Sequence, residues 1–142
     1  MRDRSKMMVA ALISGFLLLA ACGSSAPAPT PTQSGPKVST DAQKFASLKG
    51  DPVNGKTKYE TTCIACHGPD LKGMPNLGKN LTTSTFLKGL PDAEAVLFLT
   101  KGRPSSDPLN TTKVDMPPRG GNPALKDQDL ADIIAYVRTM QK

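Results

Sequence analysis

Apolar side chains near the end of the chain recur at helical spacing. They stand three or four positions apart, at Leu130, Ile133, Ile134, Val137 and Met140. Residues with this spacing share one face of an α-helix. The pattern predicts a helix over residues 127–140 whose apolar face, Met140 included, packs into the core.

A second stretch carries signals that mark both ends of a helix. Asp92 and Glu94 stand at its start, where acidic side chains suit the helix dipole, and Gly102 follows its last residue. Alanine, valine and leucine residues between them supply an apolar surface. The pattern predicts a helix over residues 92–101.

A third helix is predicted over residues 52–63. Asp51 is a suitable N-cap, and Pro52 has the fixed backbone angle that suits the first helical position. Gly55 and Tyr59 lie four residues apart and share one face of this helix. Because glycine has no side chain, Gly55 would let this helix cross the last helix closely, with Tyr59 packed against it.

The remaining sequence has weak strand signals and long polar stretches. Residues 103–123 are rich in proline, glycine, asparagine and serine. A loop of that length in a small domain is usually functional. We therefore expect an all-α fold in which three main helices are joined by long loops.

The start of the chain has the composition of an export signal. Basic residues are followed by an apolar run from Val9 to Ala21, 13 residues long. A membrane-spanning helix needs about 20 apolar residues, whereas a shorter run after a basic start is typical of secretion signals. We predict a signal peptide over residues 1–21.

Cys22 ends the tetrapeptide Leu-Ala-Ala-Cys, which resembles the lipobox of bacterial lipoproteins. The resemblance implies cleavage before Cys22 and lipid on this residue. The protein would then be anchored outside the cytoplasm, in the periplasm or on the outer face of the cytoplasmic membrane. Ordinary cleavage near Ala21, which leaves a free thiol, is the alternative. Proline, alanine, serine and threonine dominate after the cysteine, so we predict a disordered tether over residues 22–44 and a folded domain over residues 45–142.

Charge and histidine content exclude several classes of function. The 142 residues carry a formal net charge of +6. A mildly basic surface suits an acidic partner or an anionic membrane. No basic stripe alternates with aromatic residues, so we expect no binding of nucleic acid. The chain has one histidine, which excludes sites that need two.

Residues 63–67 read Cys-Ile-Ala-Cys-His, a C-x-x-C-H motif that is the signature of c-type haem attachment. Cys63 and Cys66 stand three positions apart, on one face of a helical turn, where each thiol can form a thioether with a haem vinyl group. His67 then binds the iron as its proximal ligand. With Cys22 assigned to lipid, all three cysteines of the chain are accounted for.

Other interpretations account for less of this motif. Structural zinc needs four ligands, and only Cys63, Cys66 and His67 cluster in the sequence. A redox-active C-x-x-C belongs to a βαβ unit, which weak strand signals do not support. A plain disulfide between the two cysteines remains open but leaves the histidine without a role.

Three methionines outside the predicted signal are candidates for the second axial ligand. Met140 lies on the apolar face of the last predicted helix. Met74 follows His67 by only seven residues, so we expect it to pack near the haem edge. Met116 follows His67 by 49 residues and precedes two prolines, which stiffen the chain. We predict His67 and Met116 as the iron ligands; a surface methionine in a loop is the alternative for Met116.

Residues 51–142 resemble a bacterial class I cytochrome c with a single haem. The resembling segments are Asp51-Pro52 with Gly55 and Tyr59, CIACHG, PNLG at 75–78, GRPSSDPLNTT at 102–112, MPPRGGNPAL at 116–125 and the closing DQDLADIIAYVR. The resemblance implies an all-α chain wrapped around one covalent haem c. It also implies that Cys63 and Cys66 carry thioethers, that His67 and Met116 bind the iron, and that the Pro75 carbonyl accepts a hydrogen bond from the His67 ring.

A His/Met pair favours ferrous iron and leaves no open coordination position. We therefore expect a membrane-tethered carrier of single electrons and not an enzyme. Its partners would be a quinol-oxidising complex upstream and a terminal oxidase or photosynthetic reaction centre downstream. A permanently docked subunit of such a complex is a second hypothesis. A peroxidase-like or gas-sensing haem protein is a third, which needs an open or easily displaced sixth ligand.

Overall fold

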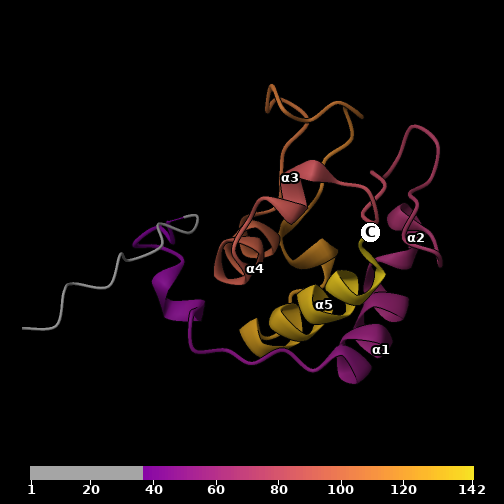
Figure 1. Cartoon of the computed structure of the whole chain (residues 1–142). Coiled ribbons are helices and arrows are strands. Elements are labelled where there is room, and N and C mark those ends of the chain that lie inside the picture. The colour runs from indigo at the N-terminus through magenta and orange to yellow at the C-terminus, as the bar shows by residue number, and fades with distance from the viewer. Residues whose placement is uncertain (1–36) are drawn as a thin grey trace, which may run out of the picture. The chain divides into compact units, whose positions relative to one another are not determined.

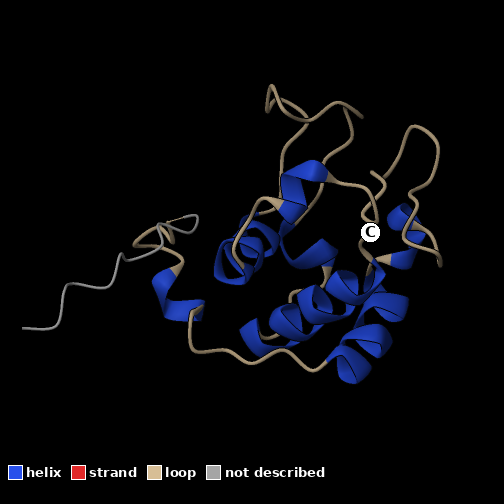
Figure 2. Ribbon diagram, viewed as in Figure 1, coloured by secondary structure: helices blue, strands red, loops and turns tan. Residues whose placement is uncertain are grey.

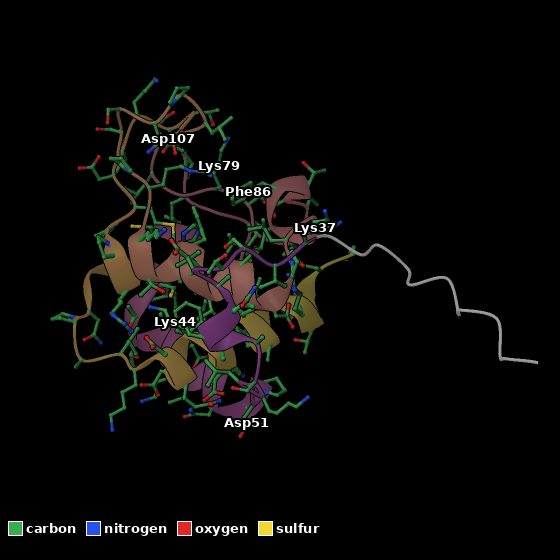
Figure 3. The ribbon with its side chains drawn as sticks, turned by 90° about the vertical axis from the view of Figure 1, so that its left-hand side faces the viewer. Lys37, Lys44, Asp51, Lys79, Phe86 and Asp107 are labelled. Carbon is green, nitrogen blue, oxygen red and sulfur yellow. The ribbon has the colours of Figure 1, made fainter. Side chains whose placement is uncertain are left out.

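The computed structural model describes residues 37–142. The predicted signal peptide, the predicted lipidation site at Cys22 and most of the predicted tether lie outside these residues. The helical elements of the described part are η1 (Gln43–Phe45), α1 (Pro52–Thr62), α2 (Ile64–His67), α3 (Thr85–Lys88), α4 (Asp92–Lys101), η2 (Pro118–Gly121) and α5 (Asp127–Met140). Long loops join them, and no strand is drawn among the described residues (Figure 2). Over this range, the helices are too short or too polar to cross a membrane.

The three longest helices are the three that the sequence predicts. α4 and α5 have the predicted bounds, and α1 ends at Thr62, one residue early. Asp51 caps α1 as expected, because its side chain accepts a hydrogen bond from the Val53 N–H at 2.8 Å. The prediction of an all-α fold is confirmed.

α1 and α5 cross in close contact, side by side in Figure 1. A Cβ atom on Gly55 would lie 1.9 Å from the Asp132 carbonyl oxygen, so only glycine permits this approach. Tyr59 is fully buried at the crossing, and its ring meets that of Tyr136 edge to face at 5.6 Å. Both expectations for this face of α1 are confirmed.

Arg138 fastens α5 to the segment that holds α3 and α4. Its guanidinium lies 2.9 Å from the Asp92 carboxylate at the start of α4. It also donates to the carbonyls of Leu87 and Leu90 at 2.8 and 2.6 Å. The buried face of α5 ends at Val137. Met140, the last residue of the helix, is 39% exposed, so the expectation that it packs in the core was wrong.

The folded part of the chain begins before residue 45, where composition placed the end of the tether. Ala42 and Phe45 are buried on a short turn. Asp41 forms an ion pair with Lys101 at 3.1 Å, and the backbone of Ser39 bonds to the Glu94 side chain. Residues 38–44 therefore pack against α4, because two apolar side chains three positions apart are enough to bury one face of a turn.

Candidate functional site

A cavity of about 860 Å³ lies within the domain. Its size falls in the range of roughly 300–1,000 Å³ that is typical of cofactor sites. Cys63, Cys66, His67 and Met116 all line it, although the methionine lies 49 residues beyond the histidine in sequence. The structure therefore brings together the four residues that the sequence singled out.

The C-x-x-C-H motif occupies the junction of α1 and α2. Cys63 follows the last residue of α1, and its N–H donates to the Tyr59 carbonyl at 2.8 Å. The His67 N–H donates back to the Cys63 carbonyl at 2.9 Å, which places both cysteines and the histidine on one helical turn. Neither cysteine is in a disulfide, so both thiols are free to react.

Burial shifts the pKa values of Cys63 and His67 in this turn. It raises the pKa of Cys63 to about 11, with a smaller contribution from the neighbouring Cys66. Burial also lowers the pKa of His67 from its ordinary 6.5, although the hydrogen bond to the Lys79 carbonyl opposes this shift. The imidazole is therefore neutral at physiological pH, which is the form that binds a metal ion.

The His67 ring is oriented by the loop that follows it. Its Nδ1 lies 2.9 Å from the Lys79 carbonyl oxygen. A carbonyl can only accept, so Nδ1 carries the proton and Nε2 keeps the lone pair that a metal needs. The expectation that the Pro75 carbonyl takes this role was wrong. Pro75 lines the cavity, but the carbonyl that accepts from the ring belongs to Lys79, four residues further on.

Close backbone packing explains why Lys79 reaches the ring. The Gly73 N–H donates to the His67 carbonyl at 2.8 Å, and the Met74 N–H donates to the Cys66 carbonyl at 3.0 Å. A Cβ atom on Gly78 would lie 2.0 Å from that same Cys66 carbonyl oxygen. The loop is thus folded back on α2, and it delivers Lys79 rather than an earlier residue to the histidine.

Met74 and Met116 are held by different parts of the chain. The backbone of Met74 is tied to Cys66, in the same loop that supports His67, and its side chain is 44% exposed. Met116 instead pairs with Arg103: the N–H of each donates to the carbonyl of the other, at 2.7 and 2.8 Å. A Cβ atom on Gly102 would lie 2.3 Å from the Met116 oxygen. The end of α4 therefore fixes the backbone of Met116 at the cavity.

Arg103 is a cavity residue that sequence reasoning missed. Its guanidinium stacks over the rings of Phe86 and Phe98, at 4.4 and 4.9 Å from their centres. Its Nε lies 3.2 Å from the Asp107 carboxylate but is buried without a hydrogen bond. The only signal in the sequence was an arginine directly after a helix end, and the two aromatic rings that hold it lie in separate helices.

These donors fit a haem. Two free thiols suit thioether bonds, and a neutral imidazole and a thioether sulfur suit the iron. A Cβ atom on Gly120 would lie 2.9 Å from the Thr62 methyl group and 4.0 Å from the Cys63 sulfur, so glycine keeps space beside this sulfur. The unsatisfied, buried N–H of Arg103 is a donor that can serve the carboxylates of a haem.

Comparison with known proteins shows that the part of the chain that holds these site residues matches one family domain. The family model described as cytochrome c matches residues 52–141. Cytochrome c-555 of Prosthecochloris aestuarii is 32% identical over 87 residues, which cover 61% of this chain and 85% of that protein. The cbb3-type cytochrome c oxidase subunit CcoP of Rubrivivax gelatinosus is 36% identical over 80 residues, 51% of this chain but only 26% of the subunit.

Cytochrome c-551 of Bacillus subtilis is 35% identical over 79 residues, which cover 52% of this chain and 60% of that protein. No solved structure gives a significant match. The family match covers both cysteines, the histidine and Met116. The chain belongs to the cytochrome c family, with one covalently attached haem c as its cofactor and electron transfer through that haem as its function.

Proposed function

We propose that this protein is a carrier of single electrons rather than an enzyme, with Cys63 and Cys66 bonded to the haem and with His67 and Met116 as ligands of its iron. The observation that carries the proposal is the shared cavity, which collects the C-x-x-C-H turn and a methionine held by a separate segment. Two protein ligands leave no position for oxygen or peroxide.

Each residue contributes one property to the carrier. The haem, when bound, supplies an iron that gains and loses one electron. His67 donates to the Lys79 carbonyl, which makes its other nitrogen a better ligand. Met116 supplies a thioether sulfur, which favours the ferrous state and raises the reduction potential. Apolar residues such as Leu99, Ile134 and Val137 line the cavity, and around a bound haem they would limit the solvent that must reorganise when the charge of the iron changes.

We further propose that the carrier works outside the cytoplasm and is anchored through lipid on Cys22. The basic start, the short apolar run and the Leu-Ala-Ala-Cys sequence support this location. Its partners would be a quinol-oxidising complex as donor and a terminal oxidase or a reaction centre as acceptor. Two relatives are named as subunits of cbb3-type cytochrome c oxidases, which supports an oxidase as the electron acceptor.

The same relatives support a second candidate, a cytochrome that is permanently docked in an oxidase. One fractionation experiment tests the anchor and separates the two roles. The wild type should be found in the membrane fraction, and Cys22→Ser should release it. After mild detergent extraction, the wild type should elute alone on size-exclusion chromatography. Co-elution with a large complex would favour the docked subunit, and a wild type that is already soluble would contradict the anchor.

The wild type itself tests whether both axial positions of the iron are filled by protein side chains. An optical spectrum of the reduced, haem-loaded protein should be the same with and without carbon monoxide, because both axial positions are filled by protein. Cytochromes that catalyse or sense gases bind this ligand readily. A carbon monoxide spectrum in the wild type would therefore contradict the carrier and favour a peroxidase-like or gas-sensing protein.

A further inference from the structure

Asn110 is an unusual residue for an exposed loop. The loop that runs from Arg103 to Met116, here called the Met116 loop, has exposed side chains such as Leu109, which is 64% exposed. Asn110 lies in the middle of this loop and yet is only 5% exposed. Apart from Asp132, it is the sole buried polar side chain among the described residues. Buried polar groups need partners, so its contacts show what it holds.

The amide nitrogen of Asn110 joins the two arms of the Met116 loop. It donates to the Val114 carbonyl at 2.7 Å and to the Pro104 carbonyl at 3.1 Å. A longer contact of 3.5 Å reaches the carbonyl of Arg103. Val114 stands two residues before Met116, and Pro104 stands directly after Arg103. One side chain therefore bridges both arms next to Arg103 and Met116, whose two backbone hydrogen bonds close the loop.

The amide oxygen of Asn110 holds the turn between these arms. It accepts from the backbone N–H of Thr112 at 3.2 Å, from the Thr112 hydroxyl at 3.0 Å and from the Lys113 N–H at 3.0 Å. Lys113 has a φ of 59°, in the left-handed region that residues with a side chain rarely adopt. This backbone needs local support, and Asn110 provides it.

We infer that Asn110 is a positioning residue for Met116: its bridge keeps the Met116 loop closed and so holds the methionine sulfur at the iron. The inference rests on the proposed function, in which Met116 is the iron ligand. A thioether is a weak ligand, so the bond is maintained only where the backbone keeps the sulfur in place. The two hydrogen bonds between Arg103 and Met116 close the loop. Asn110 adds hydrogen bonds to Pro104 and Val114, which lie next to this pair inside the loop.

Asn110→Asp is the sharpest test, because it keeps the size and the accepting oxygen but removes the donor. The new carboxylate would face the carbonyls of Val114 and Pro104, which repel it. Carbon monoxide binds only while the methionine is off the iron, so its apparent affinity reports the open fraction. We expect the affinity of the reduced, haem-loaded protein for carbon monoxide to rise about tenfold or more. The reduction potential should fall, since the ferrous state loses its thioether.

A matched control uses the same substitution at Asn122, which lies beyond Met116. The Asn122 side chain accepts a hydrogen bond from the Ala124 N–H and donates one to the Thr62 hydroxyl, and neither partner belongs to the Met116 loop. Asn122→Asp should leave the carbon monoxide affinity and the potential unchanged. A purely structural role for Asn110 predicts instead that Asn110→Asp lowers the melting temperature but leaves both haem readouts at wild-type values, which would overturn the inference.

Met116→Ala separates failure of this inference from failure of the proposed function. If Met116→Ala binds carbon monoxide while Asn110→Asp behaves as the wild type, Met116 is the ligand and Asn110 does not position it. If Met116→Ala also behaves as the wild type, the ligand assignment itself is wrong and the inference falls with it. Should Asn110→Asp yield no haem-loaded protein, Asn110→Ser replaces it with the same expected rise, and an unchanged affinity again overturns the inference.

Discussion

Replacing Met116 by alanine should open the iron to carbon monoxide and lower the reduction potential. Alanine keeps the backbone N–H and carbonyl that pair with Arg103, so the loop stays closed while the sulfur is lost. Axial ligands tune haem potentials over about 0.8 V, and loss of a thioether should lower this one by on the order of 0.1 V. The optical spectrum of the reduced variant with carbon monoxide and a potentiometric titration measure the two effects.

Met74→Ala is the control for this variant. Both methionines line the cavity, but Met74 belongs to the loop that supports His67 and is 44% exposed. Its replacement should leave the iron closed and the potential near the wild-type value. A reversed result, with Met74→Ala open and Met116→Ala closed, would move the iron ligand to the shorter loop and contradict the assignment.

Gly55→Ala should cost the domain much of its stability. The added Cβ atom would meet the Asp132 carbonyl oxygen at 1.9 Å and the carbon of that carbonyl at 2.4 Å. Both are backbone atoms, so relief requires α1 and α5 to move apart. We expect a loss of about 3 kcal/mol or more, a large part of the about 5–15 kcal/mol that holds an ordinary domain together. Urea unfolding of the haem-loaded protein, followed by far-ultraviolet circular dichroism, measures the loss.

Gly89→Ala provides the matched comparison. Gly89 has a helical φ of −75°, and its nearest new contact would be the Thr85 oxygen at 3.3 Å. A methyl group fits there with a small adjustment, so stability should stay within about 0.5 kcal/mol of the wild type. Equal stability of the two variants would show that the crossing of α1 and α5 tolerates a side chain.

The sequence predicts those elements whose bounds are marked by residues within or directly beside the element itself. The bounds of α4 and α5 follow from apolar spacing and from residues at the helix ends, and the C-x-x-C-H motif fixes its own turn. α3 was not predicted, because four residues are too few to show a periodic pattern. The turn at Ala42 was missed as well, because the composition around it is that of a linker.

Site details that depend on tertiary contacts were harder to predict. The choice of Lys79 over Pro75 as partner of His67 follows from how closely Gly78 packs on Cys66, which no local pattern encodes. Arg103 is held by two rings from different helices, α3 and α4. The place of Met116 in the cavity wall could be predicted, because a methionine before two prolines, far beyond the histidine, is itself a local signal.

The pairing of α1 with α5 also joins the two ends of the cytochrome domain. α1 has 11 residues, which is marginal for a helix without tertiary support. Its partner is the last helix of the domain, so their pairing must offset the entropy of closing a long segment of chain. Without α5, Tyr59 would lose the ring of Tyr136, and the turn with Cys63 and Cys66 would follow a helix that has lost its support. The last helix of the sequence therefore helps to hold the haem-binding turn, although the two lie at opposite ends of the domain in sequence.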